Sequence, residues 1–212
     1  MNCSKPVPLP SVAEEITNAV SHGIGALLSV GILPILVLCA EGTAATCGAI
    51  LFGLSLIFLY LMSTLYHSFP NGAAKKVLQQ MDHAAIFVLI AGSYSVFCLS
   101  RFYETIGPQL CIEVWSLAAI GILAQIIWGR KAHIFAQVLY LLMGWLVISH
   151  FHEVVATFTP AQFWFLLAGG LFYTVGFVFY AHQRIPWMHP TWHFFVLGGS
   201  VCHVICAMLI FL

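Results

Sequence analysis

The chain has 212 residues, of which 61% are hydrophobic and 7% are charged, and its mean hydropathy is +0.99. Soluble domains carry about 25% charged residues, so this chain could not cover a water-facing surface and requires lipid as its solvent. The net charge is zero and no basic run is present, which argues against nucleic acid as a partner. No pattern in the sequence specifies an oligomeric state.

Residues 1–18 are predicted to form a short cytoplasmic segment ahead of the first membrane span. They contain three prolines, one lysine and the pair Glu14 and Glu15. A secretory signal instead has a positively charged stretch followed by a short apolar stretch. The first apolar segment is therefore expected to remain as a true span. Glu14 and Glu15 are expected to be solvated or to start a helix. The alternative is that they line the cytoplasmic opening of the bundle.

Apolar segments long enough to cross a bilayer follow one another along the rest of the chain. A transmembrane helix needs about 20 apolar residues. The sequence predicts seven such spans, at residues 19–40, 45–68, 83–100, 111–128, 133–150, 161–181 and 191–212. Short connectors with turn residues or charges separate them. The predicted fold class is an all-α membrane protein, a seven-transmembrane helix bundle that forms one domain over residues 19–212.

The basic residues predict how this bundle is oriented. Six of the seven lie on the side of the N-terminal tail and of the second, fourth and sixth connectors: Lys5, Lys75, Lys76, Arg130, Lys131 and Arg184. The other side holds only Arg101. Positive charge stays cytoplasmic in membrane proteins with short loops. We therefore expect a multi-pass protein of the inner (plasma) membrane with its N-terminus in the cytoplasm and its C-terminus outside.

Several ionisable side chains are expected at one level of the membrane, near its cytoplasmic face. Span two ends with Ser63 and His67, span three begins beside Asp82, the only aspartate, and span seven opens with His189 and His193. Ionisable groups inside membrane spans are costly and usually functional. The topology therefore predicts that three helices distant in sequence deliver these groups to one site.

The spacing of the histidines suits a metal ion. His189 and His193 are four residues apart, so they stack on one helix face, and Pro190 is tolerated in the first turn of a helix. Two such histidines with His67 from another helix would make the three-nitrogen set of a catalytic zinc site, with the fourth position open for water. Ser63 could hydrogen-bond the ligands or the bound water, and Asp82 could orient a ligand or deprotonate that water.

Each of these groups also has a structural explanation. His67 alone could be a hydrogen-bonding group at the membrane edge, and Asp82 could be the N-cap of span three. His22, near the start of span one, could join a second layer around the metal. His83 points about 100° away from Asp82 around the helix, which favours a structural role. His203 lies about 21 Å along the helix from His189 and could not bind the same ion.

Three motifs resemble the hemolysin III branch of the progestin and adipoQ receptor superfamily: Ser-Thr-Leu-Tyr-His at 63–67, Met-Asp-His-Ala-Ala-Ile at 81–86 and His-Pro-Thr-Trp-His at 189–193. The resemblance covers nearly the whole chain. It implies a seven-helix fold with zinc near the cytoplasmic face, held by His67, His189 and His193, and it matches the family's aspartate and serine positions to Asp82 and Ser63. The chain lacks the long N-terminal extension of the animal receptors, so a hormone-receptor role is not expected.

The first functional hypothesis is a zinc-dependent intramembrane hydrolase of a lipid amide or ester. The resemblance supports it, because the superfamily has ceramidases among its relatives. Zinc would activate a bound water and polarise the scissile carbonyl. Asp82 would then act as general base and Ser63 would help to hold the oxyanion. A membrane lipid would be the substrate, and the enzyme would act in membrane lipid homeostasis.

The alternative hypothesis is a non-enzymatic sensor or regulator of membrane homeostasis with a structural zinc. A transporter is a third possibility, but it would need ionisable groups along its full depth, and spans four and six are almost bare of them. The name of the branch also suggests cytolysis, which we do not expect of an integral inner-membrane protein.

Overall fold

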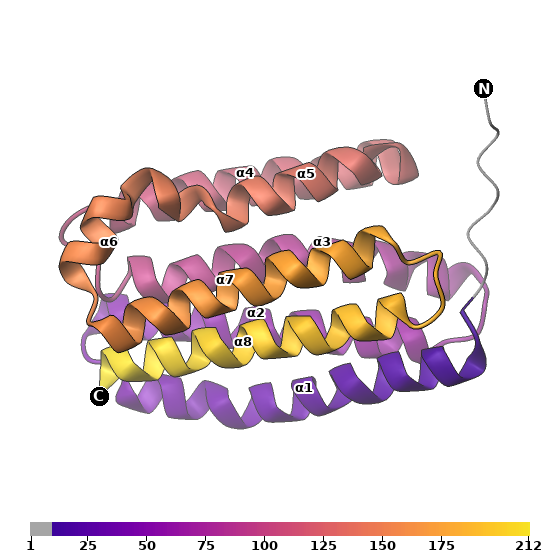
Figure 1. Ribbon diagram of the computed structural model, residues 1–212, viewed down its shortest axis with the longest axis horizontal. Coiled ribbons are helices and arrows are strands. Elements are labelled where there is room, and N and C mark those ends of the chain that lie inside the picture. The colour runs from indigo at the N-terminus through magenta and orange to yellow at the C-terminus, as the bar shows by residue number, and fades with distance from the viewer. Residues whose placement is uncertain (1–9) are drawn as a thin grey trace.

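A computed structural model describes residues 10–212 and shows a bundle of helices (Figure 1). The described elements are α1 (Val12–Cys39), α2 (Thr43–Ser68), α3 (Ala73–Cys98), α4 (Gly107–Trp128), η1 (Gly129–Ala132), α5 (His133–Gly144), η2 (Leu146–His150), α6 (Phe151–Thr157), α7 (Pro160–Ala181) and α8 (Met188–Phe211). Residues 1–9 of the predicted N-terminal segment, Lys5 among them, lie outside the described residues.

The bundle contains seven crossings that are long and apolar enough to span a membrane, which confirms the predicted number of spans and shows a multi-pass membrane protein. The fifth crossing is composite, because α5, η2 and α6 together make the stretch His133–Thr157, longer than the predicted span 133–150. Since the number of crossings is odd, the start of α1 and the C-terminus lie at opposite ends of the bundle (Figure 1).

Helix α1 begins well before the predicted span 19–40 because a capping box starts it. The backbone N–H of Glu14 donates to Ser11 Oγ at 3.2 Å, and the backbone N–H of Ser11 donates to Glu14 Oε2 at 2.8 Å. This exchange satisfies two N–H groups that have no partner inside the helix. Glu14 and Glu15 therefore lie in the first turn of α1, as one of the two predicted alternatives for them required.

Helix α3 also begins earlier than predicted, at Ala73 rather than near residue 83. Its first turns contain Lys75, Lys76 and two glutamines, which are good helix formers although they are polar. The interpretation of Asp82 as the N-cap of this helix is therefore wrong. Asp82 lies inside the helix, about two and a half turns from its start, and its side chain is buried.

Two clusters of buried side chains hold the bundle together, and α3 belongs to both. The larger cluster joins α1, α2, α3 and α8 through residues such as Leu36, Phe52 and Val196. The smaller cluster joins α3 to α4 and α5 through Phe87 and Val114 among others. Helix α7 packs along α8, and α4 and α5 lie farther from α1 than the other helices do (Figure 1). The bundle therefore has a tight half and a more open half.

The tight half depends on close contact between α2 and α3 at Gly48. A Cβ atom added there would lie 2.7 Å from the carbonyl oxygen of Ser95 and 3.1 Å from Cα of Val96. Both are backbone atoms, so the neighbouring helix would have to move as a whole. Gly31 in α1 offers a matched comparison, because a Cβ atom there would have nothing within 4 Å.

We expect Gly48→Val to destabilise the protein by about 1–3 kcal/mol through overpacking, whereas Gly31→Val should leave stability nearly unchanged. Both substitutions put the same β-branched residue into a helix, so the loss of glycine itself cancels in the comparison. Thermal unfolding of the two purified variants in one detergent measures the difference. Equal midpoints for the two variants would contradict the packing described for α2 and α3.

Candidate metal centre

Three histidines meet at the end of the bundle where α2 ends and α8 begins. His67 Nε2 and His189 Nε2 are 3.2 Å apart, and His193 Nε2 is 3.2 Å from His189 Nε2. The ligand atoms of the three side chains all lie within 4.8 Å of one another. His67 and His193 are buried. The structure therefore brings the three predicted ligands into a buried cluster that could hold a metal ion.

The start of α8 presents two of these histidines in successive turns. The helix begins at Met188, after Trp187 adopts a left-handed conformation with φ 65°. The backbone N–H of Trp187 donates to Glu14 Oε1 at 2.7 Å, which ties this turn to α1. His189 consequently falls in the first turn of α8, followed by Pro190, as the sequence predicts.

Helix α1 lies directly behind the histidine cluster. His67 Nδ1 is 2.5 Å from Glu15 Oε2, and Ser21 Oγ is 3.4 Å from His193 Nδ1. The ring of His22 stacks on that of His193, with centroids 3.6 Å apart and planes at 11°. One face of α1 therefore supports two of the three histidine rings from the side away from the cluster.

Glu15 is not among the predicted site residues. Its carboxylate also accepts a hydrogen bond from Lys75 Nζ at 2.8 Å, and only 21% of its side chain is exposed. A sequence signal does exist, because Glu15, Asn18 and His22 are spaced three and four residues apart on one face of an otherwise apolar helix. Asn18 and His22 are buried, so this polar stripe faces the bundle.

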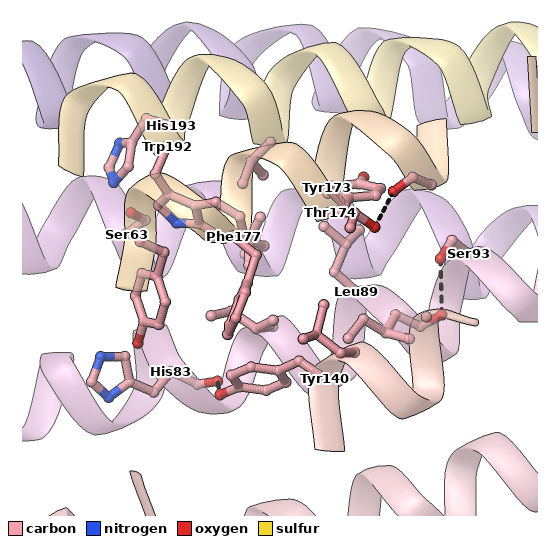
Figure 2. A pocket seen from close by; sticks show the side chains of 18 of the residues that line it. Ser63, His83, Leu89, Ser93, Tyr140, Tyr173, Thr174, Phe177, Trp192 and His193 are labelled. Carbon is pink, nitrogen blue, oxygen red and sulfur yellow. Dashed lines mark hydrogen bonds between the residues drawn. The ribbon is translucent and has the colours of Figure 1, made fainter. Parts of the chain in front are cut away.

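Ser63 and Asp82 lie at the wall of an internal cavity of about 110 Å³ that also reaches His189 and His193. Asp82 is 8% exposed and Ser63 is 1% exposed. Among residues 10–212, the Ser63 hydroxyl has no hydrogen-bond partner. Figure 2 shows Ser63 and His193 at the same end of this cavity. All five predicted site residues of the three motifs therefore gather at one end of the bundle.

The cavity continues away from the histidines between α3, α5 and α7, where its wall is mostly apolar and aromatic. Figure 2 shows Leu89 and Phe177 along it and Thr174 at its far end. A second cavity, of about 360 Å³, shares Trp145 and His203 with the first. The polar end is thus continuous with a long apolar space inside the bundle.

Two further histidines lie outside the cluster of three candidate ligands, and His83, for which the sequence favoured a structural role away from Asp82, lines the same cavity as Asp82. The backbone carbonyl of His83 accepts a hydrogen bond from the Tyr140 hydroxyl at 2.8 Å. His203 Nε2 lies 3.3 Å from the carbonyl oxygen of Leu166. His203 is not one of the clustered ligands, in agreement with its distance along α8.

Comparison with known proteins establishes the family. A family model described as "Haemolysin-III related" matches residues 11–204. The chain belongs to the haemolysin-III related family. It is similar to the "Hemolysin-3 homolog" of Bacillus subtilis (strain 168), with 40% identity over 201 residues, 93% of this chain and 94% of that protein. It is also similar to "Hemolysin-3" of Bacillus cereus, with 40% identity over 200 residues, 93% of this chain and 91% of that protein. No solved structure matches the chain.

The haemolysin-III match confirms the resemblance that the three motifs indicated. The motifs at 63–67, 81–86 and 189–193 all lie inside the matched region. Their residues meet at one end of the bundle. In this haemolysin-III related protein the motifs are therefore close together in space as well as ordered along the chain.

We expect the purified protein to carry about one metal ion per chain, and His67→Ala or His193→Ala to lose it, because a three-histidine site cannot spare a ligand. His152→Ala is the control, since this histidine is exposed in α6. Elemental analysis by mass spectrometry after removal of free metal measures the content. Equal metal content in all three variants would exclude the cluster as the binding site.

Proposed function

We propose that this protein is a zinc-dependent intramembrane hydrolase that cleaves an amide or ester bond of a membrane lipid, and that it acts in membrane lipid homeostasis. One observation carries the proposal: three clustered imidazoles lie beside a buried carboxylate at the polar end of an apolar cavity. A metal ligand set, a candidate base and a space for an acyl chain are thus contiguous.

The histidine geometry favours zinc as the ion. Zinc binds imidazole nitrogen at about 2.0–2.1 Å in tetrahedral geometry, which places the nitrogens about 3.3 Å apart. The two closest nitrogen pairs in the cluster are 3.2 Å apart. His67, His189 and His193 would hold the ion, and three protein ligands leave the fourth position free. When bound, zinc supplies a Lewis acid that activates water and polarises a carbonyl group.

Asp82 has the position of a general base. Its carboxylate is buried on the cavity wall that also includes His189 and His193. In the proposed reaction, Asp82 accepts a proton from the attacking water and passes it to the nitrogen or oxygen that leaves the acyl carbon. The water oxygen then belongs to the new carboxylic acid, and the leaving group departs as an amine or alcohol.

Ser63 is the candidate partner of the carbonyl oxygen. An unsatisfied buried hydroxyl costs about 1–3 kcal/mol, and no described residue provides Ser63 Oγ with a partner. Ser63 stands one turn before His67 on α2, and it lines the same cavity as His189 and His193, which would hold the ion. Donation of this hydroxyl to the developing oxyanion would stabilise the transition state.

A lipid is the substrate class that the mostly apolar wall of the cavity favours. Beyond its polar end the wall is lined by side chains such as Ile86, Leu89 and Phe177, which suit an acyl chain. Membrane-embedded ligands of this kind bind in mostly apolar cavities with a few convergent polar groups. The scissile bond would lie beside the histidines while the chain extends between α3, α5 and α7.

We also propose that the histidine end faces the cytoplasm across the inner (plasma) membrane. At this end, the first turn of α3 and the α4–α5 and α7–α8 connections carry five of the six basic residues of the described chain: Lys75, Lys76, Arg130, Lys131 and Arg184. The opposite end carries Arg101. Positive charge on short loops is retained in the cytoplasm, so the N-terminus would be inside and the C-terminus outside.

Reporter fusions test this orientation. An alkaline phosphatase fused after Leu212 should be active in a bacterial host, because that enzyme folds only outside the cytoplasm, whereas a fusion in the α4–α5 connection at Lys131 should be inactive. Fluorescent protein fusions at the same two sites should give the opposite pattern. The reverse pattern in both reporters would overturn the proposed orientation.

Asp82→Asn tests the proposed reaction. We expect lipid hydrolysis to fall by about 10²–10⁴-fold, the range that a general base contributes, while the metal content is retained because Asp82 is not one of the three clustered ligands. Lipid profiling of membranes that contain wild type, Asp82→Asn or the exposed control Glu41→Gln measures the effect. The control should match wild type.

The hydrolase proposal would be contradicted if wild type and Asp82→Asn gave the same lipid profile while both contained the metal. That result would instead favour a sensor or regulator of membrane homeostasis in which zinc is structural.

A further inference from the structure

Two adjacent glutamates in the first turn of α1 each reach one of the elements that carry the clustered histidines. Glu14 Oε1 accepts from the backbone N–H of Trp187, directly before α8, at 2.7 Å. Glu15 Oε2 lies 2.5 Å from His67 Nδ1 on α2. The two contacts differ in kind, because only Glu15 contacts the ring of a candidate ligand.

The Glu15 contact determines which nitrogen of His67 carries the proton. A carboxylate accepts hydrogen bonds and donates none when ionised, so this short contact favours the tautomer with the hydrogen on Nδ1, over the longer 3.4 Å approach of Asn18 Nδ2 to the same nitrogen. The other nitrogen, Nε2, then presents its lone pair, and it is Nε2 that lies 3.2 Å from His189 Nε2 in the cluster. The pairing therefore selects the tautomer that a metal ion at the cluster requires.

Lys75 fixes the second oxygen of the same carboxylate. Its Nζ donates to Glu15 Oε1 at 2.8 Å and to the carbonyl oxygen of Phe69 at 3.1 Å. It also lies over the ring of Tyr66, 5.0 Å from the centroid. With one oxygen held by Lys75 and the other against His67, the carboxylate has little freedom to turn.

The other two candidate ligands have no comparable partner. His193 Nδ1 lies 3.4 Å from the neutral hydroxyl of Ser21, and His189 Nδ1 has no partner among residues 10–212. Glu15 is therefore the one carboxylate that the described part of the chain places against an outer nitrogen of the cluster. A partly buried carboxylate beside the ligand also adds a negative charge near a divalent cation.

We propose that Glu15 is a positioning residue of the metal centre, which fixes the tautomer and ring orientation of His67, and that Lys75 holds Glu15 in place. The inference rests on the metal site of the proposed function. Carboxylates that hold metal-binding histidines in this way raise the basicity of the ligand and increase metal affinity by about 10–100-fold.

The experiment is a Zn²⁺ competition titration of the purified full-length protein in detergent against a chromophoric chelator. Glu15→Ala should weaken zinc binding by about 10–100-fold, and Glu15→Gln should weaken it in the same direction, because the amide keeps the size but loses the charge. Lys75→Met, which keeps the length of the stem, should weaken it less, since the carboxylate remains.

Glu14→Gln is the matched control. It removes the same charge from the same helical turn, but the amide oxygen of glutamine can still accept the hydrogen bond from the Trp187 backbone N–H, so the turn before α8 is kept and zinc affinity should remain that of wild type. A structural role for Glu15 is distinguished by thermal unfolding of the metal-free proteins, in which Glu15→Gln and Glu14→Gln should be similar. The visible spectrum of the Co²⁺-loaded protein should change in Glu15→Ala and remain unchanged in Glu14→Gln.

Zinc affinity of Glu15→Gln and Glu15→Ala equal to that of wild type would overturn the inference, as would an equal loss in Glu14→Gln. These outcomes do not depend on whether the protein hydrolyses a lipid. A protein that hydrolyses no lipid but loses zinc affinity in Glu15→Ala would retain the inference. A wild-type protein that binds no zinc would overturn the inference together with the metal site.

Discussion

The convergence of His67 with the pair on α8 is the constraint on which the rest of the structure depends. Imidazoles and a carboxylate within a bundle of apolar helices cost free energy unless they are paired or coordinate an ion. The inter-nitrogen distances of 3.2 Å bring three such groups to within reach of one ion. That arrangement requires α2 and α8 to lie close together at this end. The larger core cluster, which includes Tyr60 of α2 and Val196 of α8, keeps the two helices together.

Helix α1 supports this polar end, because its inner face carries the polar side chains that contact the histidines of α2 and α8. Its outer face is apolar and exposed, with Leu27 and Leu28 among the exposed side chains. The inner face carries Glu15, Asn18 and His22 in one stripe. A single amphipathic helix thus meets lipid on one side and supports the histidine cluster on the other, while its Glu14 contact orients the turn that begins α8.

The sequence predicts the spans and the level of the site better than the contacts within it. Hydropathy and spacing are sufficient to place His67, Asp82 and His189 at one depth, because each depends only on where a span begins or ends. Hydropathy could not predict the first residue of α3, because polar residues such as Lys75 extend the helix beyond its apolar part. Glu15 could not be assigned either, because its partner depends on how α1 rotates against α2, which hydropathy does not determine.

The asymmetry of the bundle connects the cluster to the cavity. Packing is close between α1, α2 and α3, with Gly48 allowing backbone contact between α2 and α3, and the histidine cluster lies at one end of this close-packed half. The cavity lies where α3, α5 and α7 surround it with large side chains such as Trp145 and Phe177. In the proposed function, the three histidines beside an apolar space would hold the head of a lipid at polar groups while its chain stays in an environment like the membrane interior. Polar chemistry and an apolar substrate can therefore meet without either leaving the surroundings that it prefers.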